Sequence, residues 1–354
     1  MNAPGLEAVA DLLSDAVTAR VTPGAVVHTG TSLGPRWTLA AGHVTYAADA
    51  ALVTPATVYD LASLTKVLAT TALAMRHACA GTLPLGTAIA DRFPQFGVQP
   101  RITVADLLEH TAGLPAHRPF YREVAGRAGY LARISAEPFT YAPRATHEYT
   151  DLGFILLGLL IEDAGGAPLA TQFDRFVGDA LGAAEVAYGV RDEWRARVAP
   201  TSVSSWRERM LVGAVHDDNA AALGGAAGHA GLFGTAAAVG AFARWFLALW
   251  QGRVIVSAGI TTGQAARFAA RATVPGSSRA LGWDTMQPTS SCGTRLSARA
   301  IGHTGFTGTS LWLDPDRDLY VVLLTNRVHP GSGGDGGGIK ALRVAVHDAL
   351  ADAR

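Results

Sequence analysis

The stretch YDLASLTKVLAT, residues 59–70, places a lysine inside an apolar run. Lys66 is one of only two lysines among the 29 basic residues, the other being Lys340. It is also the only charged side chain between Asp60 and Arg76. The run has the character of a helix packed into a core, and a buried ammonium group without a partner is costly. We therefore expect Lys66 to be paired or to give up its proton.

Ser63 lies three positions before Lys66, so on a helix the two side chains share a face. A lysine amine whose pKa is lowered by apolar neighbours can accept the proton of a serine hydroxyl, whereas arginine stays protonated. The positive end of the helix near Ser63 would favour the oxyanion that forms after nucleophilic attack. The alternative is an ordinary serine at a helix start, because Ser-x-x-Lys alone is a common pattern.

A second candidate residue, Tyr149, lies in HEYTDLGFILLGLL, residues 147–160. It precedes Thr150 and Asp151, either of which could cap the apolar helix that follows. A phenol held at a helix entry can relay a proton or stabilise a base. A tyrosine that merely packs at a helix start is the competing interpretation.

The third stretch is IGHTGFTGTSLWLDP, residues 301–315. Glycines at 302, 305 and 308 beside a strand imply close approach of a ligand or of a neighbouring strand. His303 is the polar group that such an approach would meet. A structural histidine with its hydrogen bonds satisfied is the alternative.

Composition narrows the classes of partner. The chain has 354 residues, of which 49% are hydrophobic, so it can bury a large core in one elaborated domain or two interleaved ones. Its formal net charge is zero and its pI is about 7.2, without the basic surface expected of a nucleic-acid binder. We expect a small-molecule or peptide substrate and no nucleic-acid partner. Oligomeric state stays open.

Cysteine use and the apolar segments bear on the compartment. Cys79 and Cys292 are far apart and form no C-x-x-C pair, which suits a reducing compartment. The N-terminal twenty residues contain acids and resemble an amphipathic helix more than a signal peptide. The apolar stretches 154–161 and 239–250 are short for a bilayer. We expect a cytoplasmic protein without a membrane span, although a secreted form trimmed of its leader would look the same.

Periodicity predicts an α+β chain in which strands lie at both ends. Expected strands cover 24–30, 37–46, 57–60, 298–303, 309–314 and 319–325. Expected helices, besides the N-terminal one and the one that carries Ser63, cover 104–109, 123–134, 152–162, 167–177 and 339–351. The first and last segments would share one antiparallel sheet. We predict one discontinuous sheet domain, 1–62 with 235–354, and a mainly helical domain, 63–234, with the active site at their junction. The glycine-rich stretch 331–338 is expected to be a loop.

The three motifs together, in this order, resemble the penicillin-recognising serine hydrolases, in particular the class C β-lactamase-like branch. That branch includes penicillin-binding proteins, D-alanyl-D-alanine carboxypeptidases, D-aminopeptidases and related esterases. The similarity covers nearly the whole chain and includes VADLLEHTAGLP (104–115), GGAAGHAGLFGTAA (224–237) and VVLLTNRVHP (321–330). These stretches resemble a subgroup with a weakly active penicillin-binding carboxypeptidase and an N-acetylmuramoyl-L-alanine amidase. The implied fold is an antiparallel sheet flanked by helices with a helical insertion.

The resemblance also implies roles for individual residues. Ser63 would be the nucleophile, Lys66 its base, and Tyr149 would assist proton transfer to the leaving group. His303 would replace the lysine of the third motif. The backbone N–H groups of Ser63 and Phe306 would form the oxyanion hole.

Other residues of the motifs would bind the substrate. Thr304 and Gly305 follow His303 in the third motif, and Asp151 stands in the tyrosine motif. His229 and the sequence His216-Asp217-Asp218 fit no standard zinc spacing and are interpreted as substrate-cleft loops, so no metal and no cofactor are expected.

Two departures from the family pattern bear on the substrate. Asp151 stands where many members carry asparagine, and its charge could raise the pKa of Lys66. His303 stands where many β-lactamases keep lysine, which reduces the fixed positive charge available to a β-lactam carboxylate. The leading hypothesis is a hydrolase acting through a Ser63 acyl-enzyme on an amide, such as a muropeptide or a D-amino-acid peptide. Alternatives are an esterase or transacylase, a weak β-lactamase, and a β-lactam- or peptide-binding sensor that does not turn over.

Overall fold

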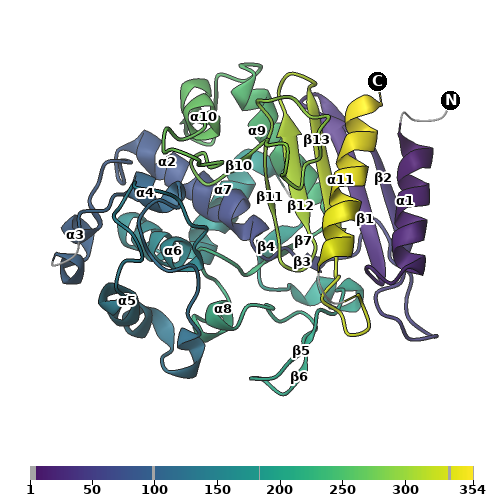
Figure 1. Ribbon diagram of the computed structural model, residues 1–354, viewed down its shortest axis with the longest axis horizontal. Coiled ribbons are helices and arrows are strands. Elements are labelled where there is room, and N and C mark those ends of the chain that lie inside the picture. The colour runs from purple at the N-terminus through teal and green to yellow at the C-terminus, as the bar shows by residue number, and fades with distance from the viewer. Residues whose placement is uncertain (1–4, 98–99, 183, 334–335, 354) are drawn as a thin grey trace.

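The computed structural model describes residues 5–97, 100–182, 184–333 and 336–353. Its main element is an antiparallel sheet with the strand order β10-β11-β12-β13-β1-β2 (Figure 1). The strands are β10 (Asp284–Thr285), β11 (Ile301–Thr304), β12 (Ser310–Asp314), β13 (Leu319–Thr325), β1 (Gly24–Thr31) and β2 (Gly34–Gly42). The expectation that the two ends of the chain share one sheet is confirmed by the pairing of β1 with β13.

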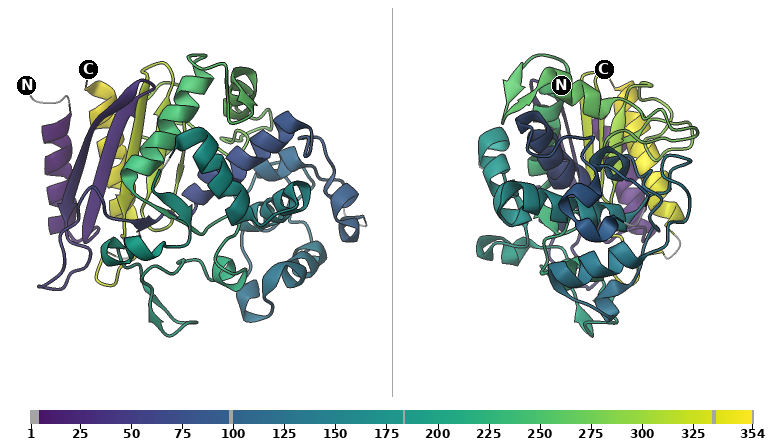
Figure 2. Two further views of the ribbon diagram at one scale, coloured as in Figure 1. Left: turned by 180° about the vertical axis from the view of Figure 1, so that it is seen from behind. Right: turned by 90° about the vertical axis from the view of Figure 1, so that its left-hand side faces the viewer.

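Alternation along β1 directs side chains into two separate cores. Ala25 and Val27 pack in a cluster with α1 (Leu6–Thr18) and α11 (Gly337–Asp352), which lie side by side on one face of the sheet (Figure 1). Val26 packs in a larger cluster that includes α9 (Ala236–Trp250) on the opposite face (Figure 2). The sheet is therefore buried on both faces, which explains the continuous apolar runs in its central strands.

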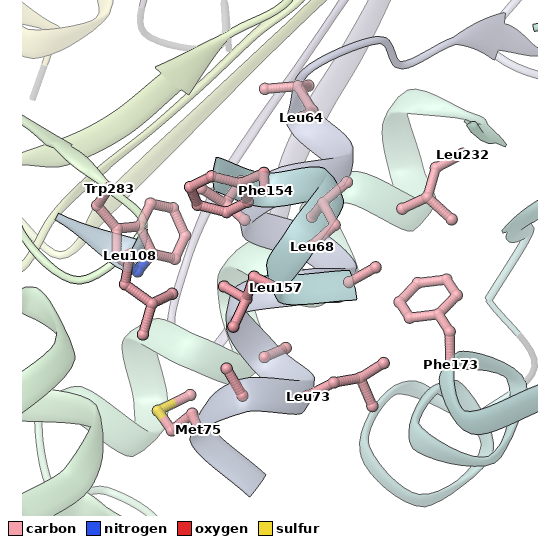
Figure 3. Packing of buried hydrophobic residues seen from close by; sticks show 14 of the residues in the cluster. Leu64, Leu68, Leu73, Met75, Leu108, Phe154, Leu157, Phe173, Leu232 and Trp283 are labelled. Atoms are coloured by element: carbon pink, nitrogen blue, oxygen red, sulfur yellow. The ribbon is translucent and has the colours of Figure 1, made fainter. Parts of the chain in front are cut away.

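The middle of the chain contributes most of the helices. They are α2 (Ala72–Ala80), α3 (Ile89–Arg92), α4 (Val104–Leu108), α5 (Gly126–Ala136), α6 (Asp151–Gly165), α7 (Leu169–Leu181) and α8 (Asp218–Ala222), followed later by α10 (Thr262–Ala269). Helix α6 is apolar on nearly all sides and packs at the centre of the larger core, where Figure 3 shows Phe154 and Leu157 close to Leu68. An all-round apolar helix must be buried in a globular protein, and this one is.

Short strands connect these helices. Strands β3 (Tyr59–Asp60), β7 (Leu232–Gly234) and β4 (Val186–Tyr188) form a small sheet beside the main one. Two hairpins, β5–β6 (Val203–Ser204 and Arg209–Met210) and β8–β9 (Val256–Ser257 and Ile260–Thr261), complete the elements. Within the described ranges no single helix is long and apolar enough to cross a membrane; only α6 and α7 taken together, bent by 75°, pass that test of length and composition.

Several element bounds differ from the expected ones. The expected strand 37–46 is β2, which ends at Gly42 because that glycine has a φ of 78° and turns the chain. The expected helix 123–134 begins only at Gly126. The segment after Ser63 is π-helical at Lys66–Thr71 before α2 continues it. Residues 1–4 and 334–335, within the expected N-terminal helix and glycine-rich loop, lie outside the described residues.

Candidate active site

A cleft of about 750 Å³ opens where the main sheet meets the helical region. Eleven residues singled out from the sequence line it: Ser63, Tyr149, Asp151, His216, Asp217, Asp218, His229, His303, Thr304, Gly305 and Phe306. Lys66 lies directly behind Ser63 and is fully buried. The structure therefore brings together every predicted site residue, although they come from segments far apart in the chain.

A sharp turn presents Ser63 to the cleft. The residue before it, Ala62, has a φ of 47°, in the left-handed region that side chains rarely adopt. The carboxylate of Asp60 holds this turn by accepting hydrogen bonds from the N–H of Ala62 (2.8 Å) and of His216 (2.6 Å). The turn therefore depends on a buried carboxylate that stands three residues before the serine.

The close approach predicted at the glycines of the third motif is made by protein neighbours. A Cβ on Gly305 would lie 2.1 Å from Oγ1 of Thr309 and 2.9 Å from the carbonyl oxygen of Leu61. A Cβ on Gly302 would lie 2.2 Å from the ring of Trp312. Gly305 thus lets the third motif pack directly against the segment that carries Ser63.

Lys66 makes three polar contacts through Nζ. It lies 3.0 Å from Oγ of Ser63, 2.8 Å from Oδ1 of Asp151 and 3.2 Å from the carbonyl oxygen of His229. A carboxylate and a carbonyl can only accept hydrogen bonds. A neutral amine would therefore donate its two N–H bonds to Asp151 and His229, which leaves its lone pair for the hydroxyl proton of Ser63.

Two opposing influences set the pKa of Lys66. Burial does lower it, but the opposing influence of the Asp151 carboxylate, with Tyr149, raises the pKa of Lys66 above its ordinary value. Of the two possibilities expected from the sequence, that Lys66 is paired or that it gives up its proton, the structure supports the pairing. As suggested from the sequence, the charge of Asp151 raises the pKa of Lys66. Lys66 is therefore an ammonium group at neutral pH, and it is paired with Asp151.

Asp151 is the first residue of α6, and Thr150 is its N-cap, accepting a hydrogen bond from the N–H of Gly153 at 3.3 Å. Burial raises the pKa of Asp151, but the Lys66 ammonium and the nearby His117 more than offset this and hold it well below its usual range. Nδ1 of His117 lies 3.8 Å from the second carboxylate oxygen. Asp151 is thus an ionised group at a helix N-terminus, where a negative charge is favoured.

Tyr149 stands between Lys66 and the third motif. Its ring centroid lies 4.9 Å from Nζ of Lys66, 4.7 Å from the ring of His110 and 5.8 Å from the ring of His303. The residue is half-buried and lines the cleft. Tyr149 is also one of the neighbours that raise the pKa of Lys66.

His303 lies on β11, is 3% exposed and lines the cleft. Its Nδ1 lies 2.8 Å from the carbonyl oxygen of Thr304, so Nδ1 must carry the proton, and Nε2 has no partner among the described residues. Burial, with the charges of Lys66 and Arg279, holds the pKa of His303 well below its usual range. His303 is therefore a neutral hydrogen-bond acceptor, unlike the cationic lysine of many β-lactamases.

Ser63 and Phe306, whose backbone N–H groups are the expected oxyanion hole, both line the cleft. Neither N–H group donates a hydrogen bond to another described residue. The carbonyl of Phe306 accepts a hydrogen bond from Nε of Arg327 (3.0 Å), and Nη2 of Arg343 on α11 donates to the carbonyl of Gly305 (2.7 Å). These arginines fix the loop whose N–H group remains free.

The cleft also contains residues that the sequence analysis did not single out. The guanidinium carbon of Arg279 lies 5.2 Å from the Tyr149 ring centroid, and Arg327 and Arg343 line the same cavity. Three arginines therefore bring positive charge into the cleft in which His303 itself is neutral. Arg279 lies in a loop without periodicity or motif, so no local signal could have pointed to it.

The side chain and the backbone carbonyl of His229 contact different residues. Nε2 lies 2.8 Å from Oδ1 of Asp217, the N-cap residue of α8, while its carbonyl contacts Lys66. His216 lies against Phe306, with 5.4 Å between ring centroids. Within the described ranges no three His, Cys, Asp or Glu side chains gather as a metal-ligand group. These histidines instead shape the wall of the cleft.

Comparisons with known proteins agree with this geometry. The family model described as Beta-lactamase matches residues 9–345. An Escherichia coli (strain K12) protein named "Putative D-alanyl-D-alanine carboxypeptidase" is 28% identical over 310 residues, which cover 78% of this chain and 70% of that protein.

Two solved structures share the fold across nearly the whole chain. "EstCE1, a hydrolase with promiscuous acyltransferase activity" has a TM-score of 0.75 at 21% identity, covering 97% of this chain and 98% of that one. A class C beta lactamase from Rhodobacter sphaeroides has a TM-score of 0.74 at 20% identity, with the same two coverages. The fold is thus of the β-lactamase/transpeptidase type, and the chain belongs to the Beta-lactamase family of serine hydrolases.

Proposed function

We propose that this enzyme hydrolyses an amide bond in a D-amino-acid peptide, such as a muropeptide, through an acyl-enzyme on Ser63. The observation that carries the proposal is the contact between Nζ of Lys66 and Oγ of Ser63, 3.0 Å, with two acceptors fixing the other donors of the amine. An amine oriented in this way beside a serine hydroxyl can act as its general base in acyl transfer.

Each step balances with the groups in the cleft. The reactive form is the one in which Lys66 has released its ammonium proton to solvent: Oγ of Ser63 then bonds to the carbonyl carbon while its proton passes to the neutral amine of Lys66. The oxyanion is held by the N–H groups of Ser63 and Phe306. When the C–N bond breaks, Tyr149 gives its phenolic proton to the departing amine and regains one from the Lys66 ammonium. Water then attacks the Ser63 ester by the same proton route and releases the acid.

The residues expected to surround the leaving group favour a carboxypeptidase reaction. A substrate that ends in D-alanine has a leaving group with a carboxylate, and neutral His303 cannot pair with it. Arg279, beside Tyr149 and His303, is the cation placed to do so, with the hydroxyl of Thr304 nearby in the same cavity. The name of the Escherichia coli relative points to the same reaction class.

Ester hydrolysis or acyl transfer is a second candidate. The unpartnered Nε2 of His303 can accept a hydrogen bond from an alcohol, which would orient an ester leaving group or an acyl acceptor. Comparison of ester and amide turnover, with and without an added alcohol or amine, separates this candidate from the first.

The proposal is tested with a peptide that ends in D-alanyl-D-alanine, by measuring released D-alanine for the wild type, Ser63→Ala and Ser14→Ala. Ser14 is an exposed serine on α1, so its variant controls for substitution as such. We expect release by the wild type and Ser14→Ala, and none by Ser63→Ala. Full release by Ser63→Ala refutes the proposal. A stable adduct on the wild type without release would favour the sensor alternative.

A further inference from the structure

A half-buried ring, Tyr121, and an exposed ring, Trp206, lie together beside the cleft. Trp206, at the turn of the β5–β6 hairpin, is 41% exposed, and its ring centroid lies 5.0 Å from that of Tyr121. Tyr121 lines the cleft that contains Ser63. The hairpin projects from the body of the molecule (Figure 1). The pair therefore extends the active-site wall outward without a break.

Hydrogen bonds hold the hairpin side of this pair in place. Arg207 donates to the carbonyls of Val215 (2.7 Å) and His216 (2.9 Å) and to the carboxylate of Asp218 (2.7 Å). These bonds tie the hairpin to the loop that forms one wall of the cleft. Trp206 is thus exposed on an anchored support.

The Tyr121 side is anchored as firmly. The Asn219 side chain, 1% exposed, accepts hydrogen bonds from the N–H of Tyr121 (3.1 Å) and the hydroxyl of Tyr130 (2.8 Å). It also donates to the carbonyl of Arg118 at 2.9 Å. Exposed aromatic surface held rigidly by buried polar groups is a mark of a binding surface, because such rings lose little conformational freedom when a ligand covers them.

Charged groups around the rings indicate the chemistry of the ligand. The guanidinium of Arg122 lies 5.6 Å from the Tyr121 ring, and that of Arg207 lies 6.0 Å from the Trp206 ring. Asp217 and Asp218 line the adjoining wall. An alkyl chain laid here would remove water from these charges without replacing its hydrogen bonds. A sugar ring presents a C–H face to the indole and hydroxyls at its edge to the charges.

We propose that Tyr121 and Trp206 form a distal subsite for a saccharide ring attached to the acyl side of the substrate. This inference rests on the proposed function and narrows its substrate class to glycan-bearing peptides. The aromatic pair supplies the flat apolar surface, and the adjacent arginines and aspartates supply hydrogen bonds to hydroxyl and acetamido groups.

The test compares a D-alanine-terminated muropeptide that carries its disaccharide with the same peptide lacking the sugars. For the wild type we expect kcat/KM to be higher for the glycosylated substrate. In Trp206→Ala that value should fall about tenfold, the scale of one aromatic contact, while kcat/KM for the free peptide stays unchanged. Trp206→Phe should restore most of the loss, and Met210→Ala, which removes another exposed side chain of the hairpin, should behave as the wild type.

A second arm measures binding of N,N′-diacetylchitobiose by saturation-transfer NMR and needs no catalysis. Binding by the wild type that Trp206→Ala abolishes supports the subsite. No binding by the wild type, or equal binding by both, overturns it, as does a wild type that does not distinguish the two peptides. If the wild type hydrolyses neither peptide but binds the disaccharide through Trp206, the proposed function fails and the subsite stands.

Discussion

At the residue scale, the chemistry depends on Lys66 having acceptors on two sides. Asp151 and the carbonyl of His229 each accept a hydrogen bond from Nζ of Lys66, and the hydroxyl of Ser63 lies on the third side of the amine. The sequence predicted that Lys66 is buried and near Ser63, because its apolar neighbours and the three-residue spacing are local features. It could not predict the net direction of the Lys66 pKa shift, because that depends on how closely Asp151, 85 positions away, approaches in the fold.

The effect of Asp151 on the base gives a prediction about pH. In Asp151→Asn the carboxylate no longer opposes the burial of Lys66, so the pKa of Lys66 falls and its neutral form is reached at lower pH. Since the neutral amine is the base, the rising limb of the kcat/KM profile against pH should shift toward lower pH. A profile superimposable on that of the wild type would contradict the assignment. Asp163→Asn, which removes a partly exposed surface carboxylate paired with Arg92, is the matched control.

Arg279 gives a second prediction at this scale. If its guanidinium pairs with the substrate carboxylate, Arg279→Ala should raise KM for a D-alanine-terminated peptide by about tenfold or more, the cost of losing a charge-assisted hydrogen bond. The same peptide with a C-terminal amide should be unaffected by the substitution. An equal rise for both peptides would assign Arg279 a structural role. Arg76→Ala, at an exposed ion pair with Asp179, is the control.

At the element scale, the hydrophobic pattern predicted most strands and helices because burial on both faces leaves continuous apolar runs. The π-helical turn at Lys66–Thr71 was not predictable, since nothing in the local sequence distinguishes it from an ordinary helix. Its last residue, Thr71, packs against Gly282, where an added Cβ would lie 1.9 Å from Oγ1 of Thr71. Gly282 also has a φ of 86°. The π-helical turn therefore packs tightly against a residue that is distant in the sequence.

Gly282→Ala should consequently disturb the segment that carries Lys66. The clash and the left-handed backbone should together lower the free energy of unfolding by about 2–4 kcal/mol. Because Lys66 moves relative to Ser63, kcat should also fall, and this fall should be larger than any change in KM. Chemical denaturation and steady-state kinetics measure the two effects. Gly86→Ala, whose Cβ would meet nothing within 4 Å, is the control, and equal effects of the two substitutions would contradict this account.

At the scale of the whole molecule, the sheet joins residues from both ends of the chain, and the site forms where it meets the helical region. The sequence motifs predicted this meeting through their family resemblance, whereas composition and periodicity alone left the partners of each strand open. The division into a sheet domain and a helical domain stays a prediction. Several histidines are buried in this framework, among them His28 between the sheet and α9 and His347 on α11.

These histidines predict acid sensitivity of the fold. Burial, aided by Arg244 at His28, lowers the pKa of His28 and of His347 to about 4, against 6.5 for an exposed histidine. The folded state therefore binds fewer protons than the unfolded state between these values. The stability is complete above pH 6.5 and falls as pH drops from 6.5 toward 4, by up to about 3 kcal/mol for each histidine.

Denaturant unfolding at pH values from 7.5 to 4 checks this dependence. His347→Gln should flatten the fall, whereas His43→Gln, at an exposed position, should leave it unchanged. The paired carboxylate of Asp217, whose pKa is lowered to about 2 by His229 and hydrogen bonds against the effect of burial, loses its contribution only at lower pH. A free energy of unfolding that stays constant from pH 6.5 to 4 would contradict the account.

The measurement that tests the central claim most directly is intact-mass spectrometry of the protein trapped during turnover, followed by peptide mapping. The wild type is mixed with a fluorophosphonate, a p-nitrophenyl ester, a penicillin and a D-alanine-terminated peptide in separate reactions. The account predicts a single covalent adduct that maps to Ser63 and is absent from Ser63→Ala. An adduct on any other residue, or turnover by folded wild type without an adduct on Ser63, would contradict it.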